Sequence, residues 1–414
     1  MSARMSVHQT IVAEQSRTRR KMLPWPLVLV LIGAVSVGLY GYYWPTKPPD
    51  LVEFVIPWYN HIVDRGPVSA FAHPFSNYTP PYLYLLAAAS LAHNVLGPVS
   101  VIKWLSVAGT GFLALAVADL VKALGGKPKR AAFTFIVPTI ALNAALLAQC
   151  DALWAGACVF ALASMMRGRT IMSLVWCGVA ISFKAQAAFI APFIVGTLIG
   201  RRTPLWQWTI PGLIYAAFMA PAWLMGWPAT DLATIYERQA DWFEWPGNLA
   251  NPWIWATQFA SGAAQPFYVL GYAAAAAAAI GICVLSANAL RRPKAMLLLA
   301  LLSAFALPFL LPKMHERYYF LADALAFSLI LTAPTPRNLY LATTIQIASL
   351  GSILSYVYFH AFPAPALVGA IVAGMATFAI YREAISAGPG RRRASSDVDD
   401  PPERGEHAFV HHLA

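Results

Sequence analysis

Long stretches with few or no charged side chains run through most of this chain, and they constrain its fold more than any other feature. Charged residues make up only 11% of the 414 residues, against about 25% in a soluble domain. Several runs are shorter than the ~20 residues that a straight span needs, so those between 152 and 200 are predicted to be short, tilted or inside the protein. We predict an all-α polytopic membrane protein of about twelve transmembrane helices, from runs at about 23–44, 100–121, 131–148, 152–166, 170–183, 185–200, 205–227, 266–290, 295–312, 318–333, 338–358 and 362–381.

Lysine and arginine cluster in the loops between alternate runs, which predicts the orientation of the chain because cytoplasmic loops carry the excess of these residues. Placing the clusters inside puts both termini in the cytoplasm. The formal net charge of +11 is therefore a topology signal, and we do not interpret it as nucleic-acid binding. The clusters are Arg17 to Lys21, Lys122 to Arg130, Arg167 and Arg169, Arg201 and Arg202, Arg291 to Lys294, Arg337, and Arg382 with Arg391 to Arg393.

The run PPYLYLLAAASLAHNVL at 80–96 looks like a further span, but counting it would invert every later loop. We predict that it lies in or near the outer interface, where an amphipathic or re-entrant helix is physically reasonable. The predicted organisation is a basic cytosolic N-terminus (1–22), a membrane domain (23–382) with long outer loops at 45–99 and 228–265, and a disordered cytosolic tail (383–414).

The first outer loop carries acids and aromatic residues next to the first span. Asp50 directly precedes a short helix whose Phe54, Trp58 and Ile62 share one face. Asp50 is either the N-cap of that helix or a functional acid. Glu53, Asp64 and Tyr78 are further polar candidates in the same loop.

Two predicted hairpin tips carry polar side chains between apolar runs. Gln149 and Asp151 lie in NAALLAQCDALWAG, and Lys184 and Gln186 lie in ISFKAQAAF. A loop aspartate is often a helix cap, and a lysine here can snorkel toward the membrane surface. A site for an anionic group would have the same pattern.

The stretch LPKMHERYYF at 311–320 places Lys313, His315, Glu316 and Arg317 between two apolar runs. Charged side chains near a membrane cost free energy unless they pair with an opposite charge or have a functional role. Residues 315–317 are consecutive and cannot share one helix face, so some should point inward and some outward. Cations at the outer surface suit a phosphate at headgroup depth, and a belt that grips lipid headgroups is the alternative.

The second outer loop mixes tryptophans with acids and amides, and its candidates are Arg238, Gln239, Asn251 and Trp253. Aromatic rings stack on sugar faces while polar groups hold hydroxyls. The same composition also suits an ordinary interfacial aromatic belt.

The stretches PPYLYLL, LLAQCDALWAG, ISFKAQAAFIAPF, ANPWIW and KMHERYYFLAD, over about residues 25–360, resemble bacterial GT-C glycosyltransferases that use polyprenyl-phosphate sugars. In order and spacing they are also similar to the glucosyltransferases of the endoplasmic reticulum that use dolichyl-phosphate glucose. Those enzymes have an acid immediately before Tyr-Pro-Pro, where this chain has Asn77 in NYTPP. Other members place the acid just after the first span, so the resemblance assigns the base to Asp50, with Asp64 and Glu53 as fallbacks.

The resemblance also implies the remaining roles. The donor would be a polyprenyl-phosphate hexose, and the acceptor a glycan or glycolipid at the periplasmic face of a bacterial plasma membrane. No cofactor is required, a divalent cation is possible, and no metal ligand is assigned. Donor-phosphate contacts are expected from Lys184, Lys313, His315 and Arg317, and substrate contacts from Glu53, Trp58, Tyr78, Gln149, Asp151, Gln186, Arg238, Gln239, Asn251, Trp253 and Glu316.

The implied reaction is a single inverting displacement, in which a base removes the acceptor proton and positive charge stabilises the departing phosphate. A secondary transporter or lipid flippase is the main alternative, because twelve spans and phosphate-binding cations also fit that class. Transporters place charges near the midplane and show internal repeats, whereas the charges here lie at the outer edge and no repeat is seen. A non-catalytic glycolipid-binding membrane protein is the third possibility.

Overall fold

The computed structural model describes residues 23–242, 247–259, 264–289, 292–359 and 361–387, and all statements on the structure concern these residues. They form helices without a strand, which confirms the predicted all-α fold. The predicted cytosolic N-terminus, part of the second outer loop and most of the predicted tail lie outside the described residues.

The elements follow one another along the chain, with 3-10 helices and one π-helix (η1) marked η. They are α2 (Trp25–Tyr43), η1 (Leu51–Val55), α3 (Ile56–Arg65), η2 (Ser69–Ala72), α4 (Pro80–Ser90), α5 (Pro98–Ala123), η3 (Pro128–Ile136), α6 (Pro138–Ala145), α7 (Asp151–Met166), α8 (Thr170–Phe183), η4 (Ala185–Ile190), α9 (Ala191–Gly200), η5 (Leu205–Thr209), α10 (Ile210–Leu224), α11 (Ala229–Ala233), α12 (Ile235–Trp242), α13 (Pro252–Phe259), α14 (Ala264–Ala287), α15 (Pro293–Leu310), α16 (Phe320–Thr332), α17 (Pro336–Tyr358) and α18 (Ala364–Ala387).

Six of the described helices are long and apolar enough to cross a membrane, namely α2, α5, α14, α15, α17 and α18. The other predicted spans form shorter helices. Three of these runs, at 131–148, 185–200 and 205–227, divide into a 3-10 helix followed by an α-helix. α7 is short and almost wholly buried, which places it inside the bundle. The chain is therefore a multi-pass membrane protein.

Proline sets where many of these helices begin. α4, α5, α6, α15 and α17 start at Pro80, Pro98, Pro138, Pro293 and Pro336. The first residue of a helix has no partner for its N–H, so proline loses nothing there, and its fixed φ angle suits the helix. The boundaries of the spans thus follow directly from the sequence.

Two glycines allow α9 and α14 to approach closely. A Cβ added at Gly196 would lie 2.1 Å from the carbonyl oxygen of Cys283, and one at Gly200 would lie 2.2 Å from that of Ala287. Glycines four residues apart share one helix face, and their lack of a side chain lets two backbones pack directly together. Any larger residue at either position would separate the two helices.

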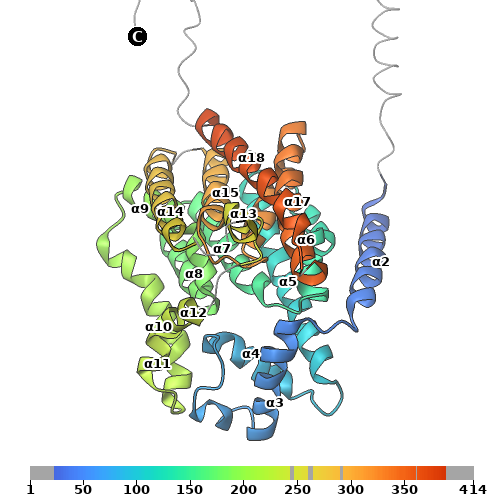
Figure 1. The fold of residues 1–414 in the computed structure, drawn as a ribbon. Coiled ribbons are helices and arrows are strands. Elements are labelled where there is room, and N and C mark those ends of the chain that lie inside the picture. Colours follow the sequence, from blue (N-terminus) through green and yellow to red (C-terminus); the bar gives the residue numbers. More distant parts are fainter. Residues whose placement is uncertain (1–22, 243–246, 260–263, 290–291, 360, 388–414) are drawn as a thin grey trace, which may run out of the picture.

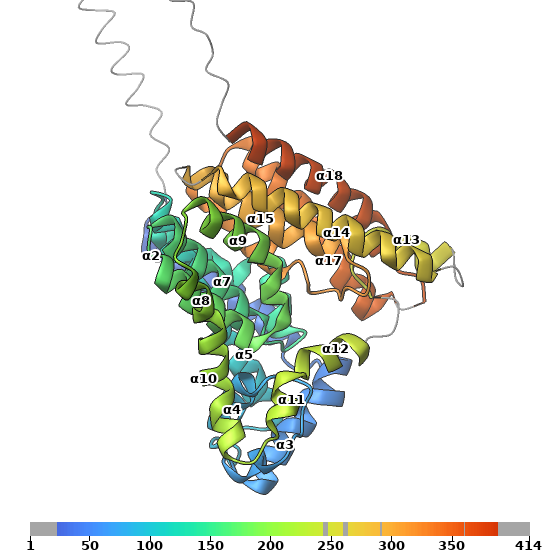
Figure 2. The same ribbon diagram turned by 90° about the vertical axis from the view of Figure 1, so that its left-hand side faces the viewer.

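The spans form the upper part of the molecule in Figure 1, and α3 and α4 form its lower end. The described chain begins and ends at the upper end. Figure 2 shows that α11 also lies in this lower region and that α12 lies above α11. α4, which covers most of the run 80–96, has 11 residues and is about 16 Å long. It is too short to cross a hydrocarbon core of about 30 Å, in agreement with its predicted place in the first outer loop.

The basic loops that the charge pattern assigns to one side contact one another. Arginines from four of them bind neighbouring loops, so these loops meet at one end of the bundle. This agrees with the predicted alternation of loops, while the cytoplasmic placement of that end stays a prediction. The contacts are Arg167 with Asp119 at 2.6 Å, Arg130 with the Leu331 carbonyl at 2.9 Å, Arg201 with the Met165 carbonyl at 2.6 Å, and Arg337 with Glu383.

A buried lysine on α5 fixes the end of the first span. The Lys103 ammonium donates hydrogen bonds to the carbonyl oxygens of Tyr43 at 2.6 Å, Trp44 at 2.9 Å and Thr46 at 2.9 Å. The last carbonyls of a helix have no partner within the helix, and a cation there is favourable. Lys103 therefore ties the segment that leads to Asp50 to the packed bundle, and the sequence analysis did not identify this role.

Candidate active site

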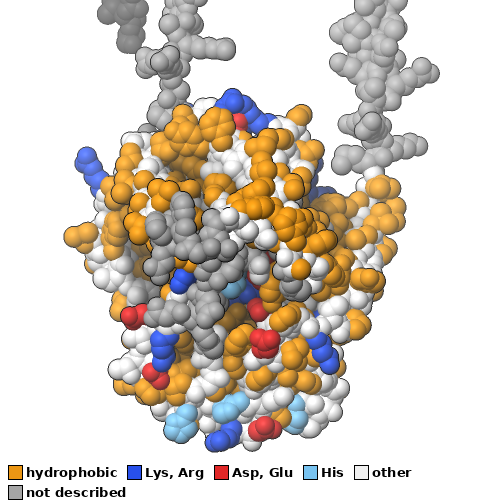
Figure 3. All heavy atoms as spheres, viewed as in Figure 1, with side chains coloured by type: hydrophobic (Ala, Val, Ile, Leu, Met, Phe, Trp, Pro, Cys, Tyr) orange, Lys and Arg blue, Asp and Glu red, His pale blue; other side chains and the backbone are white. Residues whose placement is uncertain are grey.

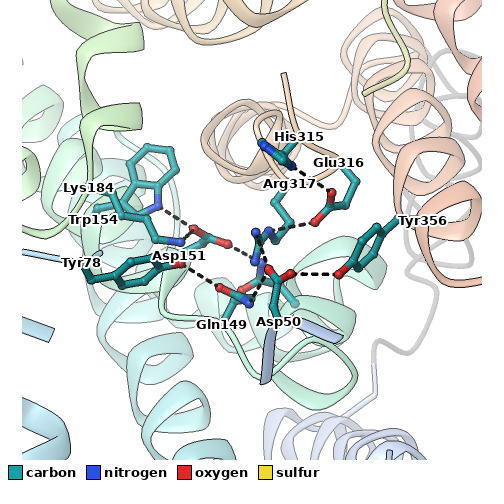
Figure 4. A network of polar contacts seen from close by, with 11 residues as sticks. Asp50, Tyr78, Gln149, Asp151, Trp154, Lys184, His315, Glu316, Arg317 and Tyr356 are labelled. Atoms are coloured by element: carbon teal, nitrogen blue, oxygen red, sulfur yellow. Dashed lines mark hydrogen bonds and ion pairs between the residues drawn. The ribbon is translucent and has the colours of Figure 1, made fainter. Parts of the chain in front are cut away.

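Polar side chains from distant parts of the sequence meet at the end of the spans opposite the basic loops (Figure 4). The space-filling view shows hydrophobic side chains over most of the upper part of this face, with acidic, basic and histidine side chains around a hollow below it (Figure 3). The cluster contains Asp50 after α2, Tyr78 before α4, Gln149 and Asp151 at the α6–α7 tip, Lys184 after α8, His315, Glu316 and Arg317 between α15 and α16, and Tyr356 on α17.

Asp50 lies at the centre of this cluster and accepts contacts from three directions. Its Oδ2 lies 2.8 Å from Nη2 of Arg317 and accepts a hydrogen bond from Nε2 of Gln149 at 3.3 Å. Its Oδ1 accepts a hydrogen bond from the Tyr356 hydroxyl at 2.9 Å. The side chain still keeps 29% exposure, so a substrate hydroxyl can reach the carboxylate.

The interpretation of Asp50 as a helix cap is wrong for this structure. Its φ of −55° and ψ of −36° are helical, and its side chain makes no capping hydrogen bond. An N-cap residue has extended dihedrals, and its side chain accepts from a free N–H of the first turn. The carboxylate instead faces the cluster, and its role as a functional acid stays a prediction.

The pKa of Asp50 is below its usual range. Burial alone would raise this pKa, but the Arg317 charge and the Tyr356 hydrogen bond together outweigh that effect. The carboxylate is therefore ionised at neutral pH. It is also a weak base for as long as Arg317 remains beside it.

Arg317 lies between two carboxylates. Its Nη2 contacts Asp50, and its Nε lies 3.0 Å from Oε1 of Glu316. The Arg317 side chain is 11% exposed and that of Glu316 only 1%. Residues 316–319 form turns instead of a helix, and all three residues at 315–317 are buried or half-buried. The expectation that some of them point outward is wrong for this reason.

Lys184 forms a second buried ion pair, with Asp151. Its Nζ lies 2.8 Å from Oδ1 of Asp151, and it also lies 4.8 Å from the centre of the Tyr78 ring. Asp151 further accepts hydrogen bonds from Nε1 of Trp154 at 2.9 Å and Nδ2 of Asn143 at 2.8 Å. Asp151 thus joins two hairpin tips, and neither simple helix capping nor snorkelling describes this pair.

These pairings leave the cluster close to neutral. Arg317 balances Asp50, and Lys184 balances Asp151, so an ionised Glu316 would be an unbalanced buried charge. Burial raises the pKa of Glu316 to about 7, and burial together with the Arg317 charge lowers the pKa of His315 to about 4. At neutral pH His315 is therefore uncharged, and the stretch 311–320 does not present a group of free cations.

The pKa of Glu316 predicts how stability depends on pH. A carboxyl whose pKa is raised in the folded state favours folding most below its unfolded pKa, near 4.5, and loses this contribution as pH rises through about 7. We expect the thermal stability of the wild type in nanodiscs to fall between pH 5 and pH 8, by about 2–3 kcal/mol relative to Glu316→Gln. Thermal unfolding of both proteins at the two pH values measures this difference.

The exposed acid Glu237 on α12 provides the matched control. Glu237→Gln should follow the wild-type pH dependence. A Glu316→Gln variant that loses as much stability as the wild type over this pH range would contradict a neutral Glu316 in the folded protein.

Two pockets next to the cluster contain further candidates. Lys313 and Gln186 line a pocket of about 210 Å³ together with Tyr318, and Lys313 Nζ lies 6.0 Å from the centre of the Tyr268 ring. Lys313 thus faces this pocket and is separate from Arg317. Trp58 and Arg238 line a second pocket, of about 420 Å³, and Gln239 borders both pockets.

The other candidates lie outside the cluster. Asn251 donates to the carbonyls of Pro308 and Leu311, and Trp253 Nε1 donates to that of Leu310. These contacts hold the end of α15, from which the stretch 311–320 begins. Glu53 is exposed on η1, in contrast to the half-buried Asp50.

Sequence reasoning missed Tyr356, Asn143 and Trp154. Each lies within or beside an apolar run, where a tyrosine or tryptophan is ordinary and a lone asparagine is easily overlooked. Only the fold brings Tyr356 to Asp50, from which it is separated by 306 positions in the chain. No local pattern identifies such a partner.

Among the described residues, no group of three or more His, Cys, Asp or Glu side chains is placed to hold a metal ion. The cluster instead offers an ionised acid, two paired cations and several amide and hydroxyl groups. This set is suited to removing a proton and stabilising an anion.

Part of the chain is similar to a known protein family. Residues 59–200 match the model of a family described as "Alpha-(1->6)-mannopyranosyltransferase, N-terminal domain". The matched region contains α4, both hairpin tips and their side chains Gln149, Asp151 and Lys184. No curated protein matches the sequence significantly. The matched family is an α-mannosyltransferase and thus a glycosyltransferase, which confirms the predicted enzyme class. The chain is a multi-pass membrane glycosyltransferase that is similar, over these residues, to α-(1→6)-mannopyranosyltransferases.

Proposed function

We propose that this enzyme transfers a hexose, with inversion, from a polyprenyl-phosphate sugar to a glycan or glycolipid acceptor. The reaction takes place at the periplasmic face of a bacterial plasma membrane, with both termini in the cytoplasm. The name of the matched family makes mannose the first sugar to test and an α-(1→6) linkage the first product. The observation that carries the proposal is Asp50, a partly exposed, ionised carboxylate that caps no helix and lies beside buried cations.

The chemistry follows from what this cluster supplies. Asp50 accepts the proton of the acceptor hydroxyl as its oxygen attacks the anomeric carbon, and the bond from that carbon to the phosphate oxygen breaks. The leaving group departs as a phosphate anion, so it needs positive charge and no acid. Arg317 is the cation nearest to Asp50 in the cluster, and Lys184 is the second buried cation there.

Arg317 has two successive partners in this proposal. Before the donor binds, Arg317 holds Asp50 and keeps its pKa low, which makes Asp50 a poor base. The donor phosphate competes for the guanidinium, because arginine binds phosphate and carboxylate with the same donor geometry. As Arg317 turns toward the phosphate, the pKa of Asp50 rises. The acid therefore becomes an effective base only after the donor has bound.

Inversion fixes the anomeric configuration of the donor. A single displacement at the anomeric carbon exchanges α for β, so an α-linked product requires a β-linked donor. A β-linked polyprenyl-phosphate sugar should thus be a substrate, and its α anomer should not.

The test is radiolabelled transfer by purified enzyme in nanodiscs. A panel of polyprenyl-phosphate sugars, including β-mannosyl and β-glucosyl donors, is combined with octyl α-mannoside acceptors. We expect transfer from the mannosyl donor, none from a nucleotide sugar, and an α-linked product on NMR analysis. A parallel reaction with EDTA tests the divalent cation, and we expect transfer to persist.

Failure of every lipid-linked donor would contradict the proposal. If the same preparation moved a fluorescent polyprenyl-phosphate lipid between the leaflets of a vesicle, the flippase interpretation would replace it.

A further inference from the structure

A pocket of about 420 Å³ lies between the first outer loop and α12. Its walls include Trp58, Phe75, Asn77, Arg238 and Gln239. This volume falls within the usual range of small-molecule sites, about 300–1,000 Å³. The first-loop residues in its wall belong to the lower end of the molecule, and α12 lies between that end and the upper part of the spans (Figure 2). Its polar lining residues are Ser76, Asn77, Arg238 and Gln239, so the pocket suits a water-soluble ligand.

The pocket is connected to the candidate base through direct contacts. The rings of Trp58 and Tyr78 lie 4.9 Å apart, and the Tyr78 hydroxyl donates to Gln149 at 3.4 Å. Gln149 in turn donates to Asp50. Phe54, also in the wall, follows Asp50 by four residues on the same helical segment, which is about one helical turn.

The polar groups of the pocket suit a neutral ligand rich in hydroxyls. Trp58 and Phe75 line the pocket, and aromatic side chains pack against the C–H face of a pyranose. The side-chain Oδ1 of Asn77 is buried and has no hydrogen-bond partner among the described residues. A buried acceptor without a partner costs free energy, which a ligand hydroxyl would recover.

The cation in the pocket is already neutralised. Arg238 donates to Oδ1 of Asp231 at 2.9 Å and to its carbonyl at 2.7 Å. These bonds orient the guanidinium, and the carboxylate offsets its charge. We therefore expect the donor phosphate to bind near Arg317 and Lys184, outside this pocket.

We infer that this pocket is an acceptor subsite, which binds a pyranose unit of an oligosaccharide next to the sugar whose hydroxyl attacks. The inference rests on the proposed glycosyl transfer. It assigns Trp58 and Phe75 to apolar contact with the sugar, and Asn77 and Arg238 to its hydroxyl groups. The enzyme therefore extends an existing glycan and prefers acceptors of more than one sugar.

The test compares two acceptors, octyl α-mannoside and octyl α-(1→6)-trimannoside, in the transfer assay. For Asn77→Ala and Arg238→Gln, we expect the KM of the trimannoside to rise at least tenfold, the loss that follows from removing one hydrogen bond to a charged or buried partner. Transfer to the monosaccharide acceptor, which does not fill this pocket, should be affected much less than transfer to the trimannoside. Glu237→Gln, an exposed neighbour on α12 outside the pocket, is the matched control.

Two outcomes overturn the subsite. In one, neither variant changes the KM of the trimannoside. In the other, both acceptors lose activity equally, which would indicate a general effect on the fold or on catalysis.

Binding of the free trimannoside, measured by calorimetry on the donor-free protein, separates this failure from failure of the proposed function. If the wild type transfers no sugar but binds the trimannoside, and Trp58→Leu abolishes that binding, the proposed reaction is wrong and the sugar site remains. If the wild type transfers sugar, but wild type and Trp58→Leu bind the trimannoside equally well, the subsite is wrong and the proposed function remains.

Discussion

Asp50→Asn is expected to lower the rate of sugar transfer by about 10²–10⁴-fold, the usual contribution of a general base. The amide keeps the size of the side chain, and its oxygen can still accept the hydrogen bond from Tyr356. It cannot accept a proton from the acceptor hydroxyl. Because Asp50 makes no capping hydrogen bond, loss of a helix cap does not explain a large effect.

Transfer assays and thermal unfolding of the same preparations measure this effect. Glu53→Gln and Asp64→Asn are the comparison variants, because both acids lie in the same loop and are exposed. They should retain the wild-type rate. Near-normal transfer by Asp50→Asn would exclude Asp50 as the base, and loss of activity in one of the other variants would then identify its replacement.

Arg317 should give the second largest effect. Losing one preorganised donor at a developing anion costs about 10²–10³-fold in rate, and we expect a loss of this size when the guanidinium is removed. Arg317→Ala alone would also leave Asp50 and Glu316 facing each other in a buried site. Breaking a buried ion pair destabilises a protein by about 3–5 kcal/mol, so that variant would mix unfolding with catalysis.

The cleaner variant is Arg317→Gln combined with Glu316→Gln, which removes the cation together with its buried neighbour. Its transfer rate should fall by the expected factor relative to Glu316→Gln. Because Asp50 also loses its counter-charge in this variant, thermal unfolding of the same preparations measures how much of the loss comes from lower stability. Arg65→Gln, an exposed arginine at the end of α3, is the control for loss of one positive charge. A double variant that transfers sugar as fast as Glu316→Gln would exclude Arg317 from stabilising the leaving phosphate.

The order of the helices and most of their positions follow from the sequence, because each span is encoded by a local apolar run and many begin at a proline. The parity of the basic loops predicts that α4 lies outside the spans, and its short length agrees with that prediction. Local patterns do not contain the pairing of charges. Lys184, His315 and Arg317 look alike in the sequence as cations near a membrane surface. In the structure Lys184 binds Asp151, His315 is uncharged, and Arg317 lies between two acids.

The limit of sequence reasoning is clearest at Asp50. Its position before a short helix allowed both a cap and a functional acid, and only backbone dihedrals and long-range partners decide between them. Tyr356 and Gln149 reach it from elements that are far away in the chain. Such partners are fixed by tertiary packing, so a single sequence without its fold does not predict them.

The hydrogen bonds of Lys103 attach the segment before Asp50 to α5. Only 11% of the α2 span is buried within the protein, so most of this helix faces the surrounding lipid. Its last carbonyls are nevertheless bound to α5, a helix that is half buried. We therefore expect substitutions on the lipid-facing side of α2 to leave the geometry around Asp50 unchanged, because Lys103 holds the carbonyls that precede this acid.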